Sequence, residues 1–264
     1  MLVSQTWKRL VPLGWKVAFH NRKSLAANTI TRVINRLAGQ PAIPPASLIY
    51  LVAAHNSAKT FIDGGRSASE TIRKVLNKHS LDINQFDKVL DFGCGVGRIM
   101  RHWSSVEGPA WHGTDYNAEL IDWCKNHLKF SDFRVNTLSG ILPYQDDTFD
   151  FIYSFSVFTH LSETLQAHWI NELSRVTKPG GYIYFTTHGP NYLSAMTPQE
   201  REQFNAGQLV VREQHESGSN YCAAFHPPNY VRKHMATDLM VVDYIPGGAN
   251  GDSLHDVHLL KKPL

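Results

Sequence analysis

Acidic residues are absent from the first 62 positions of this 264-residue chain, and the first carboxylate is Asp63. The same stretch carries eight of the 26 Lys and Arg residues, so the net charge of +3 conceals a basic start and a remainder with 18 basic and 23 acidic side chains. An acid-free start of this kind is typical of an organelle transit peptide, of an arm for nucleic acid, or of a helix on an anionic membrane. The alternative is a solvated cationic face on helices that pack against the rest of the protein.

The chain is also short of cysteine and of long apolar runs. Its three cysteines, Cys94, Cys124 and Cys222, form no CxxC pair, which argues against a disulfide framework and against a zinc site. Residues 10–19 are apolar but are interrupted by Lys16, and they fall short of the roughly 20 residues that a membrane-spanning helix needs. We therefore expect a cytoplasmic protein without a bound metal, whose basic start is free to contact a membrane surface or an anionic carrier.

Charged residues make up 19% of the chain and apolar residues 42%, which excludes a disordered protein and leaves ample material for a core. The length fits one large α/β domain with additional elements. Three prolines within residues 41–45 mark the clearest linker, because proline fixes the chain in an extended form. We predict a basic helical arm and linker over residues 1–60 and a single domain over residues 61–264.

Helical and strand patterns alternate from residue 67 onward. Ser67 and Glu70 have the spacing of a capping box, which predicts a helix that ends near residue 79. Further helices are predicted over residues 97–104, 117–127 and 162–176, and strands over residues 88–92, 111–114, 133–136, 150–154 and 182–187. Five strands interspersed with helices predict a parallel sheet covered by helices on both faces.

Beyond residue 187 the alternation loosens. A helix start at residues 197–200, a hairpin of residues 209–214 and 221–225, and a helix over residues 229–236 are predicted. Two final strands, over residues 239–245 and 256–260, are expected to be joined through Pro246-Gly247-Gly248. We therefore predict that residues 188–237 form an insertion on the acceptor side of the sheet.

The most informative segment is the glycine-rich stretch that follows the first predicted strand. Gly93, Gly95 and Gly97 form a GxGxG pattern with Asp91 just before it, between a strand and a helix. Glycines permit the sharp turn and close ligand approach that nucleotide sites need at the carboxyl ends of parallel strands. Asp91 would repel a pyrophosphate but attract an ammonium group, which favours an aminoacyl nucleoside over a dinucleotide.

A second carboxylate, Asp115, ends the next predicted strand, 24 residues after Asp91. A carboxylate at this place is able to accept hydrogen bonds from both hydroxyls of a ribose. The alternative is a glycine turn in some other α/β protein, with Asp115 serving only as a helix cap.

Together these motifs resemble class I S-adenosylmethionine-dependent methyltransferases, and the resemblance covers residues 61–260. It is carried by the 89–97 loop, Asp115, Leu142-Pro143-Tyr144 followed by Phe149-Asp150, residues 156–161 and Thr177-Lys178-Pro179-Gly180-Gly181. The resemblance implies a Rossmann-like, mostly parallel seven-stranded sheet in the order 3-2-1-4-5-7-6, with strand 7 antiparallel. It also implies S-adenosylmethionine as the cofactor.

The resemblance further implies roles for individual residues. Gly93, Cys94, Gly95 and Gly97 would bracket the methionine part of the cofactor, with Asp91 near its amino group. Asp115 would hold the ribose, and Tyr116 would flank the adenine beside Leu138 and Ser139. Family members often have an acid near position 138 that binds the adenine amino group; here it is Leu, so a backbone carbonyl is the expected substitute.

Two further groups of residues complete the implied cofactor site. Ser154, Phe155 and Ser156, at the end of the fourth predicted strand, would line the methyl donor. Residues 61–66 resemble a turn that contacts the methionine carboxylate, which adds Gly65 and Arg66 to the candidates.

The candidate catalytic residues are histidines, because transfer to a hydroxyl requires a general base near the strand ends. His188 directly follows the fifth predicted strand and is the favoured base. His160 follows the fourth strand, with the alternative that it only orients its loop, and His226 lies in a rigid Phe-His-Pro-Pro turn that forms either a pocket wall or only a turn.

The sequence disfavours several kinds of acceptor. The fourth strand ends in Ser154-Phe155-Ser156-Val157 and not in the Asn/Asp-Pro-Pro-Tyr/Phe box of adenine N6 methylation, and its aromatic residues are not interleaved with Lys and Arg as in a nucleic-acid groove. We predict transfer to a small molecule, on oxygen of a sugar, a lipid-linked compound or a secondary metabolite. The alternatives are an RNA or protein methyltransferase that uses the basic arm, and a non-catalytic scaffold that binds the cofactor.

Overall fold

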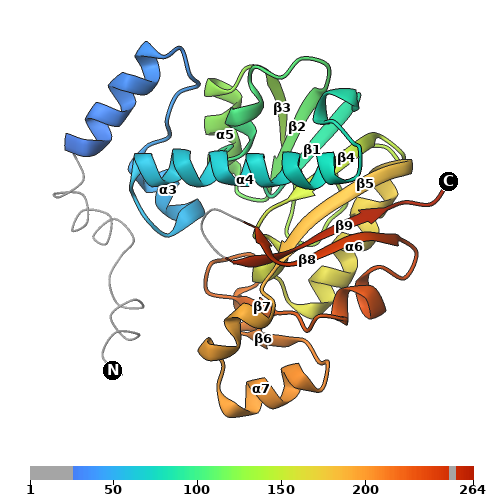
Figure 1. Ribbon diagram of the computed structural model, residues 1–264. Coiled ribbons are helices and arrows are strands. Elements are labelled where there is room, and N and C mark those ends of the chain that lie inside the picture. Colours follow the sequence, from blue (N-terminus) through green and yellow to red (C-terminus); the bar gives the residue numbers. More distant parts are fainter. Residues whose placement is uncertain (1–25, 250–253) are drawn as a thin grey trace.

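A computed structural model describes residues 26–249 and 254–264. Its centre is a seven-stranded sheet in the order β3-β2-β1-β4-β5-β9-β8 (Figure 1). Strands β1 to β5 are mutually parallel, whereas β9 runs antiparallel to both β5 and β8. Because β8 and β9 are the sixth and seventh strands of this sheet in chain order, the predicted order 3-2-1-4-5-7-6 is confirmed.

The strands agree with the sequence prediction to within a few residues, except that β5 begins earlier and β8 extends further. Their bounds are β1 Lys88–Phe92, β2 Ala110–Asp115, β3 Ser131–Val135, β4 Phe149–Ser154, β5 Thr177–Thr187, β8 Met240–Ala249 and β9 His255–Lys261. Pro246, Gly247 and Gly248 lie inside β8, so the prediction that they form the connection to the last strand was wrong.

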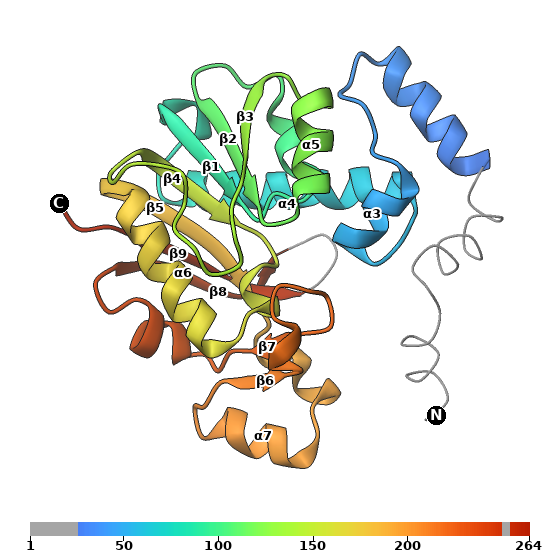
Figure 2. The same ribbon diagram turned by 180° about the vertical axis from the view of Figure 1, so that it is seen from behind.

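Helices cover both faces of the sheet, as Figures 1 and 2 show from opposite sides. Helices α3 (Ala46–Ala53), α4 (Ala58–Lys78) and α5 (Ala118–His127) cover one face, and α6 (Glu163–Val176) covers the other. From Phe151 on, alternate residues of β4 enter the two cores: Phe151 and Tyr153 pack beneath α4, and Ile152 packs beneath α6. Phe149, which a register shift in the pairing with β5 separates from them, also packs beneath α6. This alternation is the two-residue period of a strand that is buried on both faces.

Helix α4 begins ten residues earlier than the sequence indicated. Its N-cap is Ser57, whose hydroxyl accepts a hydrogen bond from the Thr60 amide at 3.2 Å, so Ser67 lies within the helix and caps nothing. The predicted turn over residues 61–66 is therefore wrong. Two glycines in this stretch suggest a turn, but a Cβ at Gly65 would lie 2.1 Å from the carbonyl oxygen of Arg98. Gly65 thus serves close packing of α4 on the segment after the glycine loop.

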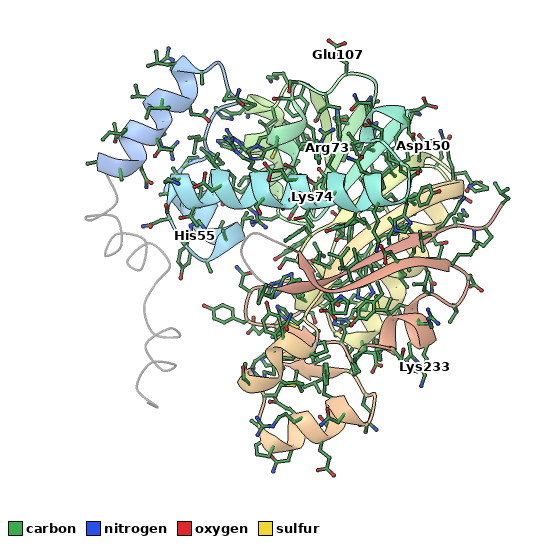
Figure 3. The ribbon with its side chains drawn as sticks, in the orientation of Figure 1. His55, Arg73, Lys74, Glu107, Asp150 and Lys233 are labelled. Atoms are coloured by element: carbon green, nitrogen blue, oxygen red, sulfur yellow. The ribbon has the colours of Figure 1, made fainter. Side chains whose placement is uncertain are left out.

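The segment after the glycine loop is less regular than predicted. In place of a helix over residues 97–104, turns lead into a short 3₁₀ helix at Met100–Trp103. Tight packing against α4 accounts for its course: Arg73 of α4 stacks over the Trp103 ring at 5.1 Å, and Figure 3 shows Arg73 and Lys74 on this helix.

The insertion after β5 forms a small unit below the sheet in Figure 1. It contains α7 (Pro198–Asn205), which starts with a complete capping box between Thr197 and Glu200, and the predicted hairpin of β6 (Val210–Arg212) and β7 (Ala223–Phe225). Four buried side chains give it a core of its own, Met196, Phe204, Val210 and Phe225. The helix predicted over residues 229–236 is present as a single π-helical turn at Val231–Met235.

The chain before α4 packs partly into the body of the protein. Ile43, Leu48 and Ile49 belong to the core beneath α4, so the basic stretch contributes buried residues before position 61. Residues 26–37 are helical and stand out from the sheet (Figure 1), whereas the apolar run 10–19 lies outside the described residues. In the part of the chain that is described, no helix is both long and apolar enough to span a membrane.

Candidate functional site

The glycine loop turns sharply at the carboxyl end of β1. The amides of Gly93 and Cys94 both donate to the carbonyl of Thr114 in β2, at 2.8 and 2.9 Å, which fixes the loop to the neighbouring strand. Gly93, Gly95 and Gly97 all have positive φ, between 54° and 75°, a region where a side chain is strained. A Cβ at Gly93 or Gly97 would collide with Val157 or Leu128 at 2.2 and 2.3 Å, so both positions also require glycine for packing.

Asp115 ends β2 beside this loop and is nearly buried, with 9% of its surface exposed. One carboxylate oxygen accepts from the Gly95 amide and the other from the Asn117 amide, each at 2.9 Å. Burial raises the pKa of Asp115, while these amide bonds oppose the rise. The carboxylate is therefore held rigidly at the strand end, where we predict that it binds a ribose.

Asp91 is more deeply enclosed. Its carboxyl group receives a hydrogen bond from Tyr153 and lies near Asp115 and Arg98, and burial raises its pKa to about 8. At neutral pH the free protein therefore holds Asp91 mainly as the neutral acid. A buried carboxyl group that lacks a full counter-charge is a place where a cationic ligand group is stabilised.

These strand ends surround a pocket of about 110 Å³. Of the predicted cofactor residues, it brings together Gly93, Asp115, Tyr116, Leu138 and Ser156. The prediction missed Asn136 and Thr137, which also line it. Among the described residues, Asn136 Oδ1 is a buried acceptor without a hydrogen-bond partner, the state expected of a group reserved for a ligand.

A backbone carbonyl was expected to replace the missing acid near position 138, and one such carbonyl, that of Leu138, already accepts the Trp169 indole N–H at 3.0 Å. The unpartnered oxygen of Asn136, two residues earlier, is the better candidate for the adenine amino group. The sequence prediction placed Asn136 inside the third strand, over residues 133–136, and so did not single out this side chain.

Other predicted cofactor residues lie outside the pocket. Ser139 and Arg66 are exposed, and Gly65 is held against Arg98 inside the protein. Ser154 and Phe155 are buried at the end of β4. Cys94 is buried in the loop, where burial raises the pKa of its thiol, so its side chain is a packing group and not a reactive thiolate.

The insertion loop, which we define as residues 213–222, covers the pocket. Tyr116 Oη donates to the carbonyl of Gly218, and the Gly218 amide donates to the carbonyl of His160, both at 2.7 Å. From the same loop, Asn220 donates to the carbonyl of Leu51 in α3 at 3.1 Å. Since ligand pockets usually measure about 300–1,000 Å³, we expect this cover to move outward when a nucleoside binds.

Gly218 is the point of closest contact between the insertion loop and the pocket. It has φ +89°, and a Cβ there would lie 2.6 Å from Leu138 Cδ1. Because the loop has to move outward for a nucleoside to bind, Gly218→Ala is expected to destabilise its closed position by about 1–3 kcal/mol of backbone strain and so to strengthen cofactor binding about tenfold, measured by calorimetry. Gly207→Ala is the matched control, because Gly207 also has positive φ but no atom within 4 Å of its Cβ position. Equal affinities for the two variants would contradict a role for this contact.

His160 and His188, which follow the neighbouring strands β4 and β5, are oriented by the same kind of hydrogen bond. His160 Nδ1 donates to the carbonyl of Cys222 at 2.7 Å, and His188 Nδ1 donates to the carbonyl of Ala224 at 3.1 Å. Because a carbonyl only accepts, each neutral ring carries its proton on Nδ1 and keeps the lone pair on Nε2. The ring centroids are 6.4 Å apart, and His160 lines the pocket.

Burial keeps both rings neutral. It lowers the pKa of His160, and it lowers the pKa of His188 to about 4 with a further contribution from His160. A neutral imidazole with a free Nε2 is in the form that accepts a proton. The pair therefore offers two general bases beside the cofactor pocket.

The third candidate, His226, lies behind these two and is 1% exposed. Its Nε2 is hydrogen-bonded to Gln166 Oε1 at 2.8 Å, and its amide donates to the carbonyl of His188. This placement favours a wall that supports His188. The sequence did not indicate His255, whose ring lies 4.7 Å from that of His188 and whose Nδ1 is 3.3 Å from Thr186 Oγ1.

A cavity of about 240 Å³ lies elsewhere, between α6 and the segment that precedes β8. Its two cations are already paired, Arg175 with Glu172 and Lys262 with Asp147, and Asp238 also lines it. Because it contains none of the predicted site residues, the smaller pocket is the better candidate. Within the described residues, no group of three or more potential ligands is placed to hold a metal ion.

The pocket and the groups behind it fit an aminoacyl nucleoside. Asp115 in the pocket supplies an acid for a sugar, and the orphaned Asn136 oxygen suits an amino group on a base. Asp91 does not line the pocket but lies buried next to the glycine loop, near Asp115, where it supplies a second acid. The glycines have positive φ, and a Cβ at each would meet a side chain of the protein, so they serve the tight, closely packed turn that holds these groups in place.

Comparison with known proteins agrees with this chemistry. Residues 90–185 match the family model of a methyltransferase domain. An uncharacterised methyltransferase of Schizosaccharomyces pombe is 32% identical over 114 residues, which are 38% of this chain and 40% of that protein. A malonyl-[acyl-carrier protein] O-methyltransferase of Salmonella typhimurium is 29% identical over 47% of this chain and 51% of its own length. The chain thus spans about half or less of these relatives.

Solved structures share the fold over a longer stretch. A methyltransferase from Methanosarcina mazei, which depends on S-adenosylmethionine, superposes with a TM-score of 0.53 at 21% identity, over 71% of this chain and 97% of that one. An S-adenosylmethionine-dependent methyltransferase from Mesorhizobium loti gives a TM-score of 0.55 at 13% identity, over 73% and 98%. Residues 90–185 thus match a methyltransferase domain, and the sheet has the fold of these S-adenosylmethionine-dependent methyltransferases.

Proposed function

We propose that this chain transfers the methyl group of S-adenosylmethionine to a hydroxyl oxygen of a small-molecule acceptor. The observation that carries the proposal is the pair of neutral imidazoles, His160 in the pocket and His188 next to it, whose Nδ1 atoms donate to carbonyls and whose Nε2 atoms hydrogen-bond to none of the described residues. Transfer to a carbon or sulfur acceptor involves no hydroxyl proton, so it would not require a base for that purpose. One of the relatives, the malonyl-[acyl-carrier protein] O-methyltransferase, is also named for transfer to oxygen.

Each part of the site has a proposed task. Asp115 holds the ribose, Asp91 the amino group and Asn136 the adenine amino group, which together fix the cofactor in place. When bound, S-adenosylmethionine supplies an electrophilic methyl group. His188 Nε2 accepts the proton that the acceptor hydroxyl releases, and the Ala224 carbonyl stabilises the resulting imidazolium through Nδ1–H. Alignment by the walls of the site supplies much of the rate, since ordering the reactants removes an entropic cost.

A small acceptor is favoured by the way in which the insertion encloses the base. The His188 ring packs against Tyr192 at 4.2 Å and Phe225 at 5.2 Å, and both residues belong to the insertion. His188 is itself largely buried, so a bulky polymer would have to displace this aromatic wall. The enclosed surface suits a sugar, a lipid-linked compound or a secondary metabolite that enters by one end.

The proposal is tested by incubating the purified chain with radiolabelled cofactor and a panel of hydroxylated small molecules, with RNA and protein as separate arms. We expect label in the methyl ether of a small hydroxylated acceptor. Label only in RNA or protein would replace the proposed acceptor class. Failure of the well-folded chain to bind cofactor by calorimetry would refute the function as a whole.

Proton release gives a second test, since Asp91 is mainly neutral in the free protein at pH 7. A bound ammonium group favours the ionised form, so cofactor binding is expected to release close to one proton and to strengthen about tenfold from pH 6 to pH 7. Calorimetry in buffers of different ionisation enthalpy measures this number. Asp91→Asn should abolish the release and weaken binding by about tenfold or more; wild-type proton release in the variant would contradict the assignment.

The same raised pKa of Asp91 makes the free protein less stable as pH rises, whereas it makes cofactor binding stronger. Above about pH 4 the unfolded chain has lost the Asp91 proton while the folded chain retains it up to about pH 8. The contribution of this group to the free energy of unfolding therefore declines as pH rises through that window, and Asp91→Asn should flatten this decline in thermal unfolding.

A further inference from the structure

The helical residues 26–37 attach to the body of the protein through polar side chains. Asn28 donates to the carbonyl of Asn56 at 2.9 Å and accepts from the Ala58 amide at 2.8 Å. One turn later Arg32 donates to the carbonyls of Ile43 and Pro44, and Asn35 donates to that of Pro41 at 2.8 Å. The inner face of this helix is thus polar, and its partners are backbone groups of the following segment.

The outer face is apolar. Ile30, Val33, Ile34 and Leu37 follow the i, i+3, i+4, i+7 spacing of a single helix face, and their exposed fractions are 60%, 52%, 61% and 83%. A helix that only covers a core has the reverse arrangement, with apolar residues inward. We call these four residues the outer apolar face. Contiguous exposed apolar side chains of this kind mark a site of interaction.

The helix is held in a fixed position, so the outer apolar face has a fixed orientation relative to the sheet. Its C-terminus is closed by Gly39 at φ +65°, with hydrogen bonds from Gly39 to Arg36 and from Gln40 to Asn35, the Schellman pattern. The linker behind it is fastened to the core by Arg101, which donates to the carbonyls of Pro41 and Ala42. An occupant of the outer apolar face would therefore meet the protein in a defined orientation.

The charge of the chain distinguishes between possible occupants. Residues 1–62 hold eight basic and no acidic side chains, and Arg36 is exposed next to the outer apolar face. In a symmetric pairing with a second copy, the same patch meets itself, so two acid-free basic stretches would be brought together and repel each other. RNA would match the positive charge, but surfaces that bind RNA stack its bases on aromatic side chains, whereas this face is aliphatic. Aliphatic side chains beside an exposed cation, in an acid-free part of the chain, match an anionic lipid surface.

We propose that the outer apolar face docks on an anionic lipid bilayer, with Ile30, Val33, Ile34 and Leu37 entering the boundary between headgroups and acyl chains. The exposed Arg36 beside this face contacts a lipid phosphate. This surface is separate from the cofactor pocket, so the proposal holds or fails independently of the proposed function.

The test is co-sedimentation of the full chain with vesicles of pure phosphatidylcholine and of phosphatidylcholine with about one third phosphatidylglycerol. We expect binding to the anionic vesicles that falls steeply as salt is raised, because surface charges are screened. Ile34→Glu/Leu37→Glu should weaken binding more than about tenfold, through loss of buried apolar area and added repulsion. Met240→Glu is the matched control, since Met240 is 58% exposed on the edge strand β8 and should bind as the wild type does.

Further measurements separate the remaining outcomes. Circular dichroism and cofactor calorimetry should be unchanged in the double variant, which shows that its fold is intact. Wild-type vesicle binding by the double variant would overturn the proposal, and so would loss of binding only when residues 1–25 are deleted. Dimerisation of the wild type in analytical ultracentrifugation that the double variant abolishes, without vesicle binding, would assign the face to a second copy. Salt-sensitive RNA binding in place of vesicle binding would likewise overturn it.

Discussion

Replacement of His188 by alanine is expected to lower kcat for methyl transfer by about 10²–10⁴-fold, the usual contribution of a general base. The ring has its Nδ1 proton committed to the Ala224 carbonyl, so Nε2 is the only nitrogen left to accept a proton. Cofactor affinity should stay at the wild-type value, because His188 does not line the cofactor pocket. Rapid-quench kinetics with radiolabelled cofactor measures the chemical step directly.

The pH profile provides the accompanying signature. Because burial lowers the pKa of His188 to about 4, the ring is the neutral base throughout the neutral range. Wild-type kcat should be level above about pH 5 and should fall as pH drops through about 4. A fall in kcat with an apparent pKa near 6.5, the ordinary value for histidine, would indicate that an exposed histidine elsewhere is the base.

Two variants separate His188 from its neighbours. His160→Ala should alter cofactor affinity as well as kcat, because the His160 ring lines the pocket. His215→Ala, at a site on the insertion that is 69% exposed, should leave both unchanged. A wild-type rate for His188→Ala combined with a slow His160→Ala would transfer the role of base to His160.

Asp115→Ala is expected to weaken cofactor binding about 100-fold or more. Two hydrogen bonds from ribose hydroxyls to a charged acceptor contribute roughly 1.5–3 kcal/mol each, and about 1.4 kcal/mol is tenfold in affinity. Calorimetric titration with S-adenosylmethionine and with S-adenosylhomocysteine measures the loss. The two ligands should be affected alike, since they share the ribose.

The same carboxylate also accepts from the amides of Gly95 and Asn117, so alanine could loosen the glycine loop. Asp115→Asn separates these effects, because its amide oxygen still serves one backbone amide while the negative charge is gone. We expect the Asn variant to unfold at nearly the wild-type temperature and yet to bind cofactor at least tenfold more weakly. Wild-type affinity in the Asn variant would exclude a ribose contact through the charge.

The sheet and the pocket could be predicted because their signals are local in the sequence. Apolar runs that end in Asp91, Asp115 and Ser154 mark parallel strands, and the carboxyl ends of such strands meet at one edge. The order of all seven strands followed from the resemblance and is confirmed. Where the chain doubles back, as in the hairpin around Gly218, turn residues gave an equally local signal.

Features that depend on distant contacts were not predictable. Gly65 resembled a turn residue, yet it is glycine because the Arg98 carbonyl occupies the space of its Cβ, more than thirty positions away. Asn136 is recognisable as a candidate only once its oxygen is seen to be buried without a partner. Likewise, no pattern indicated that Gly218 would reach Tyr116 and Leu138, since the insertion folds over the pocket as a separate unit.

The carbonyls that orient His160 and His188 belong to Cys222 and Ala224, two positions apart on one stretch of main chain. Main-chain oxygens persist when side chains are exchanged, so neither tautomer depends on the identity of those two residues. The side chains that line the insertion can thus change, and with them the choice of acceptor, while the proton-accepting nitrogens keep their orientation.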